Sequence, residues 1–429
     1  MSLARQTRIA LATCLALGSG GALAACANVL GFEQFAPLHG EAGTGAEGGR
    51  DATGDAPADG GAEASPCVGD LSVNSQHCGT CGHSCGGGSC EMNQCLPVKL
   101  ADNLVRPQGL VVNATEVFVA EHGLDRIARF GKDAMNTCVI PARCLFTSLA
   151  TRKPTAMGID GANVYWANAP AQDQNEIRSC PHAGCKSSAP TLVGGIGVGA
   201  FSRDEPNDTR LPLELIVRDG QVFWPEYATG AIRSTPVSGG GLVTTYTEDS
   251  GDGVVALAID DARLYFTEDR AAGAIDIKAV RRSAPLTVTP LTSPASRPFG
   301  IALTSTGTLY FTVPYQVDIG DGLVQATTTS SDGGLAATIA SREVAPGPML
   351  VDDTNVYWLI AGDVLKATGS LVYCPLAGCP ADGPIVLAGG QRVPRHLTQD
   401  ASAIYWTNEG LENDRTDGQL WKIAKPSKP

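Results

Sequence analysis

The stretch Val164-Tyr165-Trp166 decides the fold, because variants of this apolar triplet occur seven times along the chain. Each copy places a β-branched residue or leucine before an aromatic residue and a further large apolar residue. The central aromatic residues are 47, 58, 42, 45, 47 and 48 positions apart, which is the period of a propeller blade. The copies are Val117-Phe118-Val119, Val164-Tyr165-Trp166, Val222-Phe223-Trp224, Leu264-Tyr265-Phe266, Leu309-Tyr310-Phe311, Val356-Tyr357-Trp358 and Ile404-Tyr405-Trp406.

Turn and strand signals surround each triplet. A residue whose side chain can close a turn through its own backbone stands five positions before the aromatic residue in five copies. A short apolar strand precedes this turn, often after a proline, as in 106–112 and 297–303. Further strands follow, such as 126–129 and 191–193, so each unit is predicted to contain four strands. The turn residues are Asn113, Asp160, Asp260, Asp352 and Asp400.

The continuous apolar triplets favour stacked sheets. Neighbouring residues on a strand point to opposite faces, so Tyr165 and Trp166 are both buried only if both faces of the sheet are covered. Blades stacked face to face provide this cover, whereas a sheet with one wet face alternates apolar and polar residues. We therefore predict an all-β fold, a seven-bladed β-propeller over 96–429, with six- or eight-bladed rings as alternatives.

The last unit has only three strands before the chain ends. The segment 97–101 resembles the fourth strand expected at 384–388, so it can supply the missing strand. Closing the ring in this way would replace two exposed strand edges with one interface.

The N-terminus has the layout of an export signal. Arg5 and Arg8 precede an apolar run over 9–17, which is too short to span a bilayer. After the small residues 18–22, the segment Leu23-Ala24-Ala25-Cys26 resembles the lipobox of bacterial lipoproteins, which implies a lipid on Cys26 after removal of a signal peptide over 1–25. The alternative is an ordinary signal-region cysteine. We expect export through the general secretory route to the cell envelope, and Ala27, which is not Asp, favours the outer membrane.

Composition separates a tether from the folded body. Residues 26–66 are rich in Gly, Ala and acidic residues, with few large apolar side chains beyond about His39, and this predicts a disordered tether. The chain has 31 basic and 44 acidic residues, a formal net charge of −13, and no run of Lys or Arg. Nucleic acid is therefore excluded as a partner, because binding to phosphates requires the opposite charge.

The cysteines indicate disulfides. Six of the 14 cysteines lie within 67–95, a segment rich in glycine and poor in apolar residues, which predicts a small disulfide-rich module. Six cysteines allow 15 pairings, and the residues do not select one. A zinc site built on Cys78 and Cys81, near His77 and His83, is the alternative. The six cysteines are Cys67, Cys78, Cys81, Cys85, Cys90 and Cys95.

Three more pairs of cysteines are close in sequence and predict disulfide-linked hairpins. Two of them lie in nearly identical phrases, CPHAGC and CPLAGC, in which Pro and Gly favour a tight turn. The pairs are Cys138 with Cys144, Cys180 with Cys185, and Cys374 with Cys379.

The phrase Tyr405-Trp406-Thr407-Asn408 resembles the YWTD repeat of the low-density-lipoprotein-receptor propellers. Together with the CPLAGC hairpin and the cysteine-rich segment, it makes the chain similar to a group of envelope lipoproteins from myxobacteria. The chain departs from the receptor repeat in having seven units rather than six and Asn where the motif ends in Asp. The resemblance therefore implies a propeller and no particular ligand.

A candidate binding rim follows from blade connectivity. The links from the fourth strand to the next first strand, and from the second strand to the third, open on one face. Polar residues stand three places after five of the aromatic residues, and basic residues precede three of the prolines. The insertion 202–211 belongs to the same face. The alternative is that the Glu and Asn side chains are bonded structurally within the blades. The rim consists of Arg106, Glu121, Lys153, Asn168, Arg203, Glu226, Glu268, Arg297 and Asn408.

These patterns favour a non-catalytic protein that binds a protein or glycan ligand, or that takes part in cell contact. No GxSxG or HExxH motif occurs in the chain, and no cysteine remains for a nucleophilic role. The alternative is a metal-dependent hydrolase, lactonase or lyase with Glu121, His122, Glu226 and Glu268 around an ion at the channel mouth. No cofactor is expected, although 249–253 offers oxygen ligands that suit a calcium ion.

Overall fold

The computed structural model describes Cys67 and residues 69–427, except for 133–144, 149–150, 171–174, 186–188, 198–200, 202–213, 248–252, 270–275, 285, 294–297, 315–319, 331–334, 364–365 and 411–415. The described residues belong to one compact unit, Ser65–Pro429. The expected signal peptide, Cys26 and the tether lie outside them.

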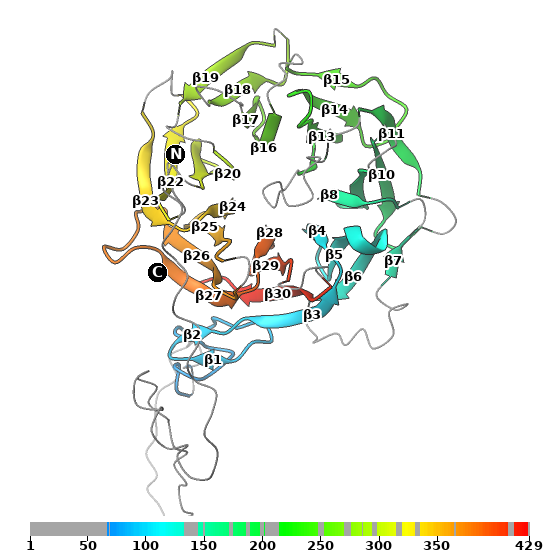
Figure 1. Cartoon of the computed structure of the whole chain (residues 1–429). Coiled ribbons are helices and arrows are strands. Elements are labelled where there is room, and N and C mark those ends of the chain that lie inside the picture. Colours follow the sequence, from blue (N-terminus) through cyan, green and yellow to red (C-terminus); the bar gives the residue numbers. More distant parts are fainter. Residues whose placement is uncertain are drawn as a thin grey trace, which may run out of the picture. The chain divides into compact units, whose positions relative to one another are not determined.

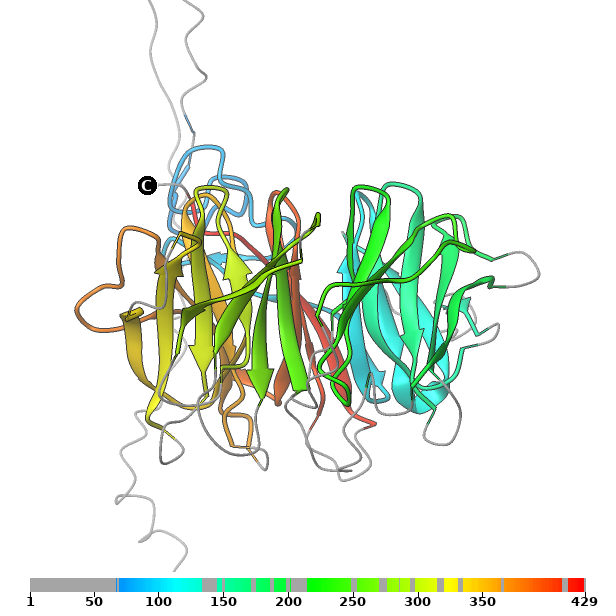
Figure 2. The same ribbon diagram turned by 90° about the horizontal axis from the view of Figure 1, so that it is seen from above.

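Seven four-stranded antiparallel sheets surround a central axis, so the predicted seven-bladed propeller is confirmed (Figure 1). Seen edge-on, the strands run between the two faces of the ring (Figure 2). The first strand of each blade lies nearest the axis (Figure 1).

Blade 1 consists of β4 (Pro107–Val112), β5 (Glu116–Glu121), β6 (Arg126–Gly131) and β7 (Leu145–Thr147), and blade 2 of β8 (Pro154–Ile159), β9 (Asn163–Asn168), β10 (Asn175–Pro181) and β11 (Thr191–Ile196). Blade 3 consists of β12 (Ile216–Arg218), β13 (Gln221–Pro225), β14 (Ile232–Pro236) and β15 (Thr244–Thr245), and blade 4 of β16 (Gly253–Ile259), β17 (Arg263–Asp269), β18 (Ile277–Arg281) and β19 (Val288–Thr292). Blade 5 consists of β20 (Ile301–Leu303), β21 (Thr308–Val313), β22 (Gly322–Thr328) and β23 (Ala337–Glu343). Blade 6 consists of β24 (Pro346–Val351), β25 (Asn355–Ile360), β26 (Gly369–Pro375) and β27 (Ile385–Gln391). Blade 7 consists of β28 (Pro394–Gln399), β29 (Ala403–Asn408), β30 (Gly418–Ala424) and β3 (Val98–Leu104).

The closing strand comes from the start of the propeller, as predicted. β3 pairs antiparallel with β30, with Val98 opposite Lys422 and Lys99 opposite Trp421. This pairing joins the two ends of the propeller sequence within blade 7 (Figure 1).

The repeated triplets form the core between neighbouring blades. Tyr165 and Trp166 are both 0% exposed, although they point to opposite faces of β9. Tyr165 packs with Val222 and Trp224 of blade 3, whereas Trp166 packs with Phe118 of blade 1. Full burial of one such side chain stabilises the fold by roughly 1.5–3 kcal/mol.

The predicted turn residues close the turns between first and second strands. Oδ1 of Asp260 accepts hydrogen bonds from the backbone N–H groups of Ala262 (2.8 Å) and Arg263 (2.7 Å). Its Oδ2 accepts a hydrogen bond from the Tyr265 hydroxyl at 2.6 Å. The same tyrosine–aspartate bond occurs in blades 2, 6 and 7, at Tyr165–Asp160, Tyr357–Asp352 and Tyr405–Asp400.

The cysteine-rich segment packs on the closing blade. Its disulfides are Cys67–Cys81, Cys78–Cys90 and Cys85–Cys95, and it contains the two short strands β1 (Cys90–Glu91) and β2 (Gln94–Cys95). Ala424 of β30 belongs to the same buried cluster as four of these cysteines. Lys422 Nζ donates to the Gly86 carbonyl oxygen at 2.9 Å. Two of the three predicted hairpin disulfides, Cys180–Cys185 and Cys374–Cys379, are confirmed, while Cys138 and Cys144 lie outside the described residues.

Candidate functional site

The polar residues of the predicted rim lie at one end of the ring, here called the channel end. They stand at or just after the ends of the second strands, opposite the beginnings of the first strands. The opposed pairs include Glu121 with Pro107, Asn168 with Pro154, Glu268 with Val254 and Asn408 with Pro394. Glu226 directly follows β13.

The three rim glutamates are buried and bonded within their own blades. Each is at most 5% exposed. Glu121 accepts a hydrogen bond from Nε of Arg126. Oε1 of Glu226 is 2.8 Å from Nε of Arg233, and Oε2 of Glu268 is 2.6 Å from Nζ of Lys278. In each case the basic residue comes from the third strand, so the ion pair ties the second strand to the third.

The two rim asparagines also make side-chain hydrogen bonds, Asn168 within its own blade and Asn408 to the last residue of β27 in blade 6. Asn168 Nδ2 donates to Glu176 Oε1 at 2.9 Å, and Glu176 pairs with Arg178 at 2.8 Å. Asn408 Nδ2 donates to Gln391 Oε1 at 2.9 Å. The described Glu and Asn residues of the rim thus lie at one end of the ring, with their side chains bonded to other side chains of the blades, which is the arrangement of the structural alternative.

The basic rim positions share an unusual backbone conformation. Arg106 and Lys153 have φ values of 50° and 47°, directly before the prolines that begin β4 and β8. Their carbonyl oxygens accept hydrogen bonds from the N–H groups of His122 and Ala169, both at 3.1 Å. Arg203, Arg297 and the insertion 202–211 lie outside the described residues, so a binding role for the rim remains a prediction.

The carboxylates of the metal-site alternative do not converge. Glu121, Glu226 and Glu268 belong to three different blades, and each makes its own hydrogen bonds. Burial, with the charges of Lys153 and Arg106, lowers the pKa of His122 to about 4, so this side chain is neutral at pH 7. Within the described part of the chain, side chains grouped closely enough to share a metal ion occur only in the cysteine-rich segment. Of the calcium candidate 249–253, only Gly253 is described.

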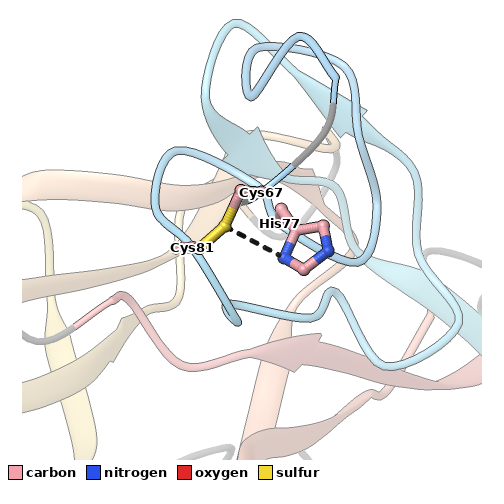
Figure 3. A group of neighbouring side chains, drawn as sticks. All are labelled: Cys67, His77 and Cys81. Atoms are coloured by element: carbon pink, nitrogen blue, oxygen red, sulfur yellow. Dashed lines mark hydrogen bonds between the residues drawn. A yellow bond between two sulfur atoms is a disulfide. The ribbon is translucent and has the colours of Figure 1, made fainter. Parts of the chain in front are cut away.

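The zinc alternative is wrong for this structure. Cys78 and Cys81 belong to different disulfides, so neither thiolate is available to a metal. His77 lies beside the Cys67–Cys81 disulfide, with Nδ1 at 3.7 Å from Cys67 Sγ (Figure 3). The same Nδ1 accepts a hydrogen bond from the Gly82 N–H group at 2.9 Å. His77 therefore serves the fold of the module.

A cavity opens at the other end of the ring, between blades 3 and 4. Its volume is about 640 Å³, within the range of small-molecule sites. Phe223 and Tyr246 form an apolar wall, with ring centroids 5.9 Å apart. The polar lining consists of Asp219, Gln221, Asp261, Arg263, Arg281, Arg282 and Ser283.

Two ion pairs join blades 3 and 4 at this cavity, one with an arginine from each blade. Arg282 of blade 4 is 2.8 Å from Asp219 of blade 3. Arg218 of blade 3 pairs with Asp261 of blade 4. The Arg282 guanidinium also lies over the Phe223 ring, 5.3 Å from its centroid. These contacts fix the walls of the cavity relative to each other.

Sequence reasoning missed this cavity. The adjacent Arg281-Arg282 pair, at the end of the third strand of blade 4, was the available signal. The ion pair of Arg282 with Asp219 of blade 3 comes only from the structure.

The structural comparisons concern the fold alone. The chain matches no protein-family model and no curated protein. No helix among its described residues is long and apolar enough to cross a membrane.

Hydrazine synthase of Kuenenia stuttgartiensis is similar at 13% identity and a TM-score of 0.50, over 74% of this chain and 95% of that chain. A gluconolactonase of Xanthomonas campestris has 13% identity, a TM-score of 0.41 and coverage of 77% and 89%. A chain of a nidogen/laminin complex has 14% identity, a TM-score of 0.39 and coverage of 59% and 87%. The chain is thus a β-propeller with a disulfide-rich segment before it.

Proposed function

We propose that this chain is an exported lipoprotein, anchored in the outer membrane through Cys26, whose propeller binds a protein or glycan ligand without converting it. The observation that carries the binding role is the contrast between the two ends of the ring. At the channel end, Glu121, Glu226 and Glu268 are committed to ion pairs within their blades. At the opposite end, a polar cavity of about 640 Å³ is open to a ligand.

The ion pairs also support a non-catalytic role. A glutamate that acts as a metal ligand or as a general base needs its oxygens directed at the metal or substrate. Glu226 instead accepts hydrogen bonds from Trp224, Thr229 and Arg233. Binding a metal would require these bonds to be given up.

Lipid attachment is tested by metabolic labelling with an alkyne fatty acid, comparing the natural chain with Cys26→Ser. We expect label and membrane association in the natural chain only. Equal labelling of the variant would refute the anchor.

The binding role is tested by titrating the full chain with purified envelope glycans and envelope proteins, and by analysing the recovered ligand. We expect saturable binding and a chemically unchanged ligand. Metal-dependent turnover of a lactone or ester that is lost in Glu226→Gln, while the melting temperature is retained, would establish the enzyme alternative instead.

A further inference from the structure

His83 joins the cysteine-rich segment to the end of the propeller through both nitrogens of its ring. Its Nδ1 lies 2.6 Å from the carbonyl oxygen of Cys78, and its Nε2 lies 2.8 Å from the carbonyl oxygen of Lys425. Cys78 belongs to the same segment as His83, whereas Lys425 directly follows β30, the third strand of blade 7. The partly buried imidazole therefore stands between the two parts.

The two carbonyl partners select the protonated form of this ring. A carbonyl oxygen only accepts hydrogen bonds, so each ring nitrogen must carry a proton to bond to its partner. A neutral imidazole carries one such proton and keeps a lone pair on the other nitrogen. In neutral His83, that lone pair would face a carbonyl oxygen at hydrogen-bond distance, which is a repulsive contact. Only the imidazolium bonds to Cys78 and Lys425 together.

The other histidine of the segment is bonded differently. His77 Nδ1 accepts a hydrogen bond from the Gly82 N–H group at 2.9 Å, so this nitrogen carries no proton. The same nitrogen lies beside the Cys67–Cys81 disulfide (Figure 3). These contacts lie within the segment, and His77 provides a matched control for the joint at His83.

The charged groups on the elements that pack at this joint are three lysines and two aspartates. Lys425 Nζ is 3.3 Å from an Asp352 carboxylate oxygen, and Lys132 Nζ is 2.6 Å from one of Asp400. Lys422 Nζ donates to carbonyl oxygens of the segment and of Lys132, at 2.9 and 3.0 Å. The lysines disfavour a further positive charge and the aspartates favour it. The two carbonyl oxygens are thus the specific contacts that favour the imidazolium.

We infer that His83 is a pH-sensitive joint, which in its protonated form fastens the cysteine-rich segment to the end of β30 and which loosens when the ring loses a proton. Histidine is the side chain whose charge ordinarily changes between pH 5 and pH 8. Protonation and attachment favour each other, so the attachment is strongest at the acidic end of this range and weakens as the pH rises. The inference goes beyond the proposed function and requires neither the lipid nor a ligand.

Other contacts keep the segment folded and close to the propeller when the joint loosens. Its three disulfides do not depend on His83. Ala424 of β30 still packs against four of the cysteines, and the chain continues directly from the segment into β3 of blade 7. We therefore expect a change in the mobility of the segment and no unfolding of the propeller.

The first experiment records the ring nitrogens of the full chain, labelled with ¹⁵N-histidine, by NMR between pH 5 and pH 8. The signals of His83 are assigned by their absence in His83→Gln. We expect two protonated nitrogens at pH 5 and one at pH 8. A ring with a single proton at pH 5, or with both protons still at pH 8, would overturn the inference.

The second experiment measures hydrogen-exchange protection of residues 69–95 at pH 5 and pH 8, corrected for the intrinsic exchange rate and compared with β21 of blade 5. In the natural chain we expect roughly tenfold greater protection at pH 5, because a hydrogen bond from a charged group contributes a stabilisation of this order. His83→Gln bonds to one carbonyl oxygen at most and carries no charge, so its protection should be low at both pH values.

The control variant is His77→Gln, whose amide oxygen can still accept the hydrogen bond from Gly82. It should keep the pH dependence of the natural chain. Equal protection of the natural chain at pH 5 and pH 8 would contradict the joint, and this measurement needs no variant. The natural pH dependence retained in His83→Gln would assign the effect to another group and would also overturn the inference.

Discussion

Replacing His396 should remove part of the pH dependence of stability. His396 lies on β28, the inner strand of the closing blade, and its side chain is only 9% exposed. Burial, with the neighbouring charge of Arg395, lowers the pKa of this imidazole from 6.5 to about 3. Because Arg395 is itself held by Glu409 at 2.8 Å, the folded site keeps a cation next to the imidazole. The folded protein therefore holds His396 neutral throughout the range from pH 7.5 to pH 5.

The size of the effect follows from proton linkage. The unfolded chain titrates this histidine near pH 6.5, so below that pH it binds a proton that the folded chain does not. Stability is therefore lost as the pH falls through 6.5 and continues to fall toward the folded pKa. At 1.36 kcal/mol per pKa unit, a change from pH 7.5 to pH 5 costs about 2 kcal/mol through His396 alone.

The assay is urea unfolding of the natural chain and His396→Gln at pH 7.5 and pH 5.0. The measured quantity is the difference in unfolding free energy between the two pH values for each protein. We expect this difference to be about 2 kcal/mol more favourable to pH 7.5 in the natural chain than in the variant. Other groups cancel in the comparison, including Glu214, whose pKa burial raises to about 7, because both proteins contain them. The same pH dependence in both proteins would refute a buried neutral His396.

Three further changes test the repeat and its attachments. Tyr265→Phe removes the hydroxyl that donates to Asp260, and we expect a loss of about 1 kcal/mol in unfolding free energy, measured by urea denaturation. Converting both Cys374 and Cys379 to serine opens a hairpin of sequence separation 5 and should cost about 2 kcal/mol of loop entropy while leaving the circular dichroism spectrum unchanged. Lys422→Met removes two bonds to backbone carbonyls, one of them in the cysteine-rich segment, and hydrogen exchange across 69–95 should become faster; unchanged exchange would show that the disulfides alone hold that segment.

The fold was predictable because its main requirement is repeated. Every blade must bury both faces of its second strand, so the apolar triplet recurs with the blade period. Asp260 and its counterparts could be identified as turn residues because an Asx turn depends on neighbouring residues only. The bond from Tyr265 to Asp260 was not predicted, although both residues were identified separately. It depends on the antiparallel geometry that brings the tyrosine back over the turn.

The candidate site was less predictable, because strand order fixes which end a residue occupies and not what it contacts. Glu121 and Glu268 lie opposite the beginnings of the first strands of their blades. Whether they face the channel or a cation on the third strand depends on side-chain reach, and here Arg126 and Lys278 reach them. The pairing of the three disulfides in the cysteine-rich segment could not be predicted either, because the sequence is compatible with all 15 pairings of the six cysteines.

The repeats provide an internal reference for separating structural from functional residues. Where the turn residue is Asp, the central aromatic residue is Tyr in all four copies, and the two are bonded. Where the turn residue is Asn113, the aromatic residue is Phe118, which has no hydroxyl to donate. Such coordinated differences preserve the fold. The opposed Arg263 and Arg281 of blade 4 differ from the other copies in another sense, because they place two like charges directly opposite each other. Arg263 is nevertheless held by its surroundings, because its guanidinium donates to the Thr329 carbonyl oxygen of blade 5 at 3.0 Å and its charge helps to lower the pKa of Asp260. This departure from the repeat therefore belongs to the contact between blades 4 and 5.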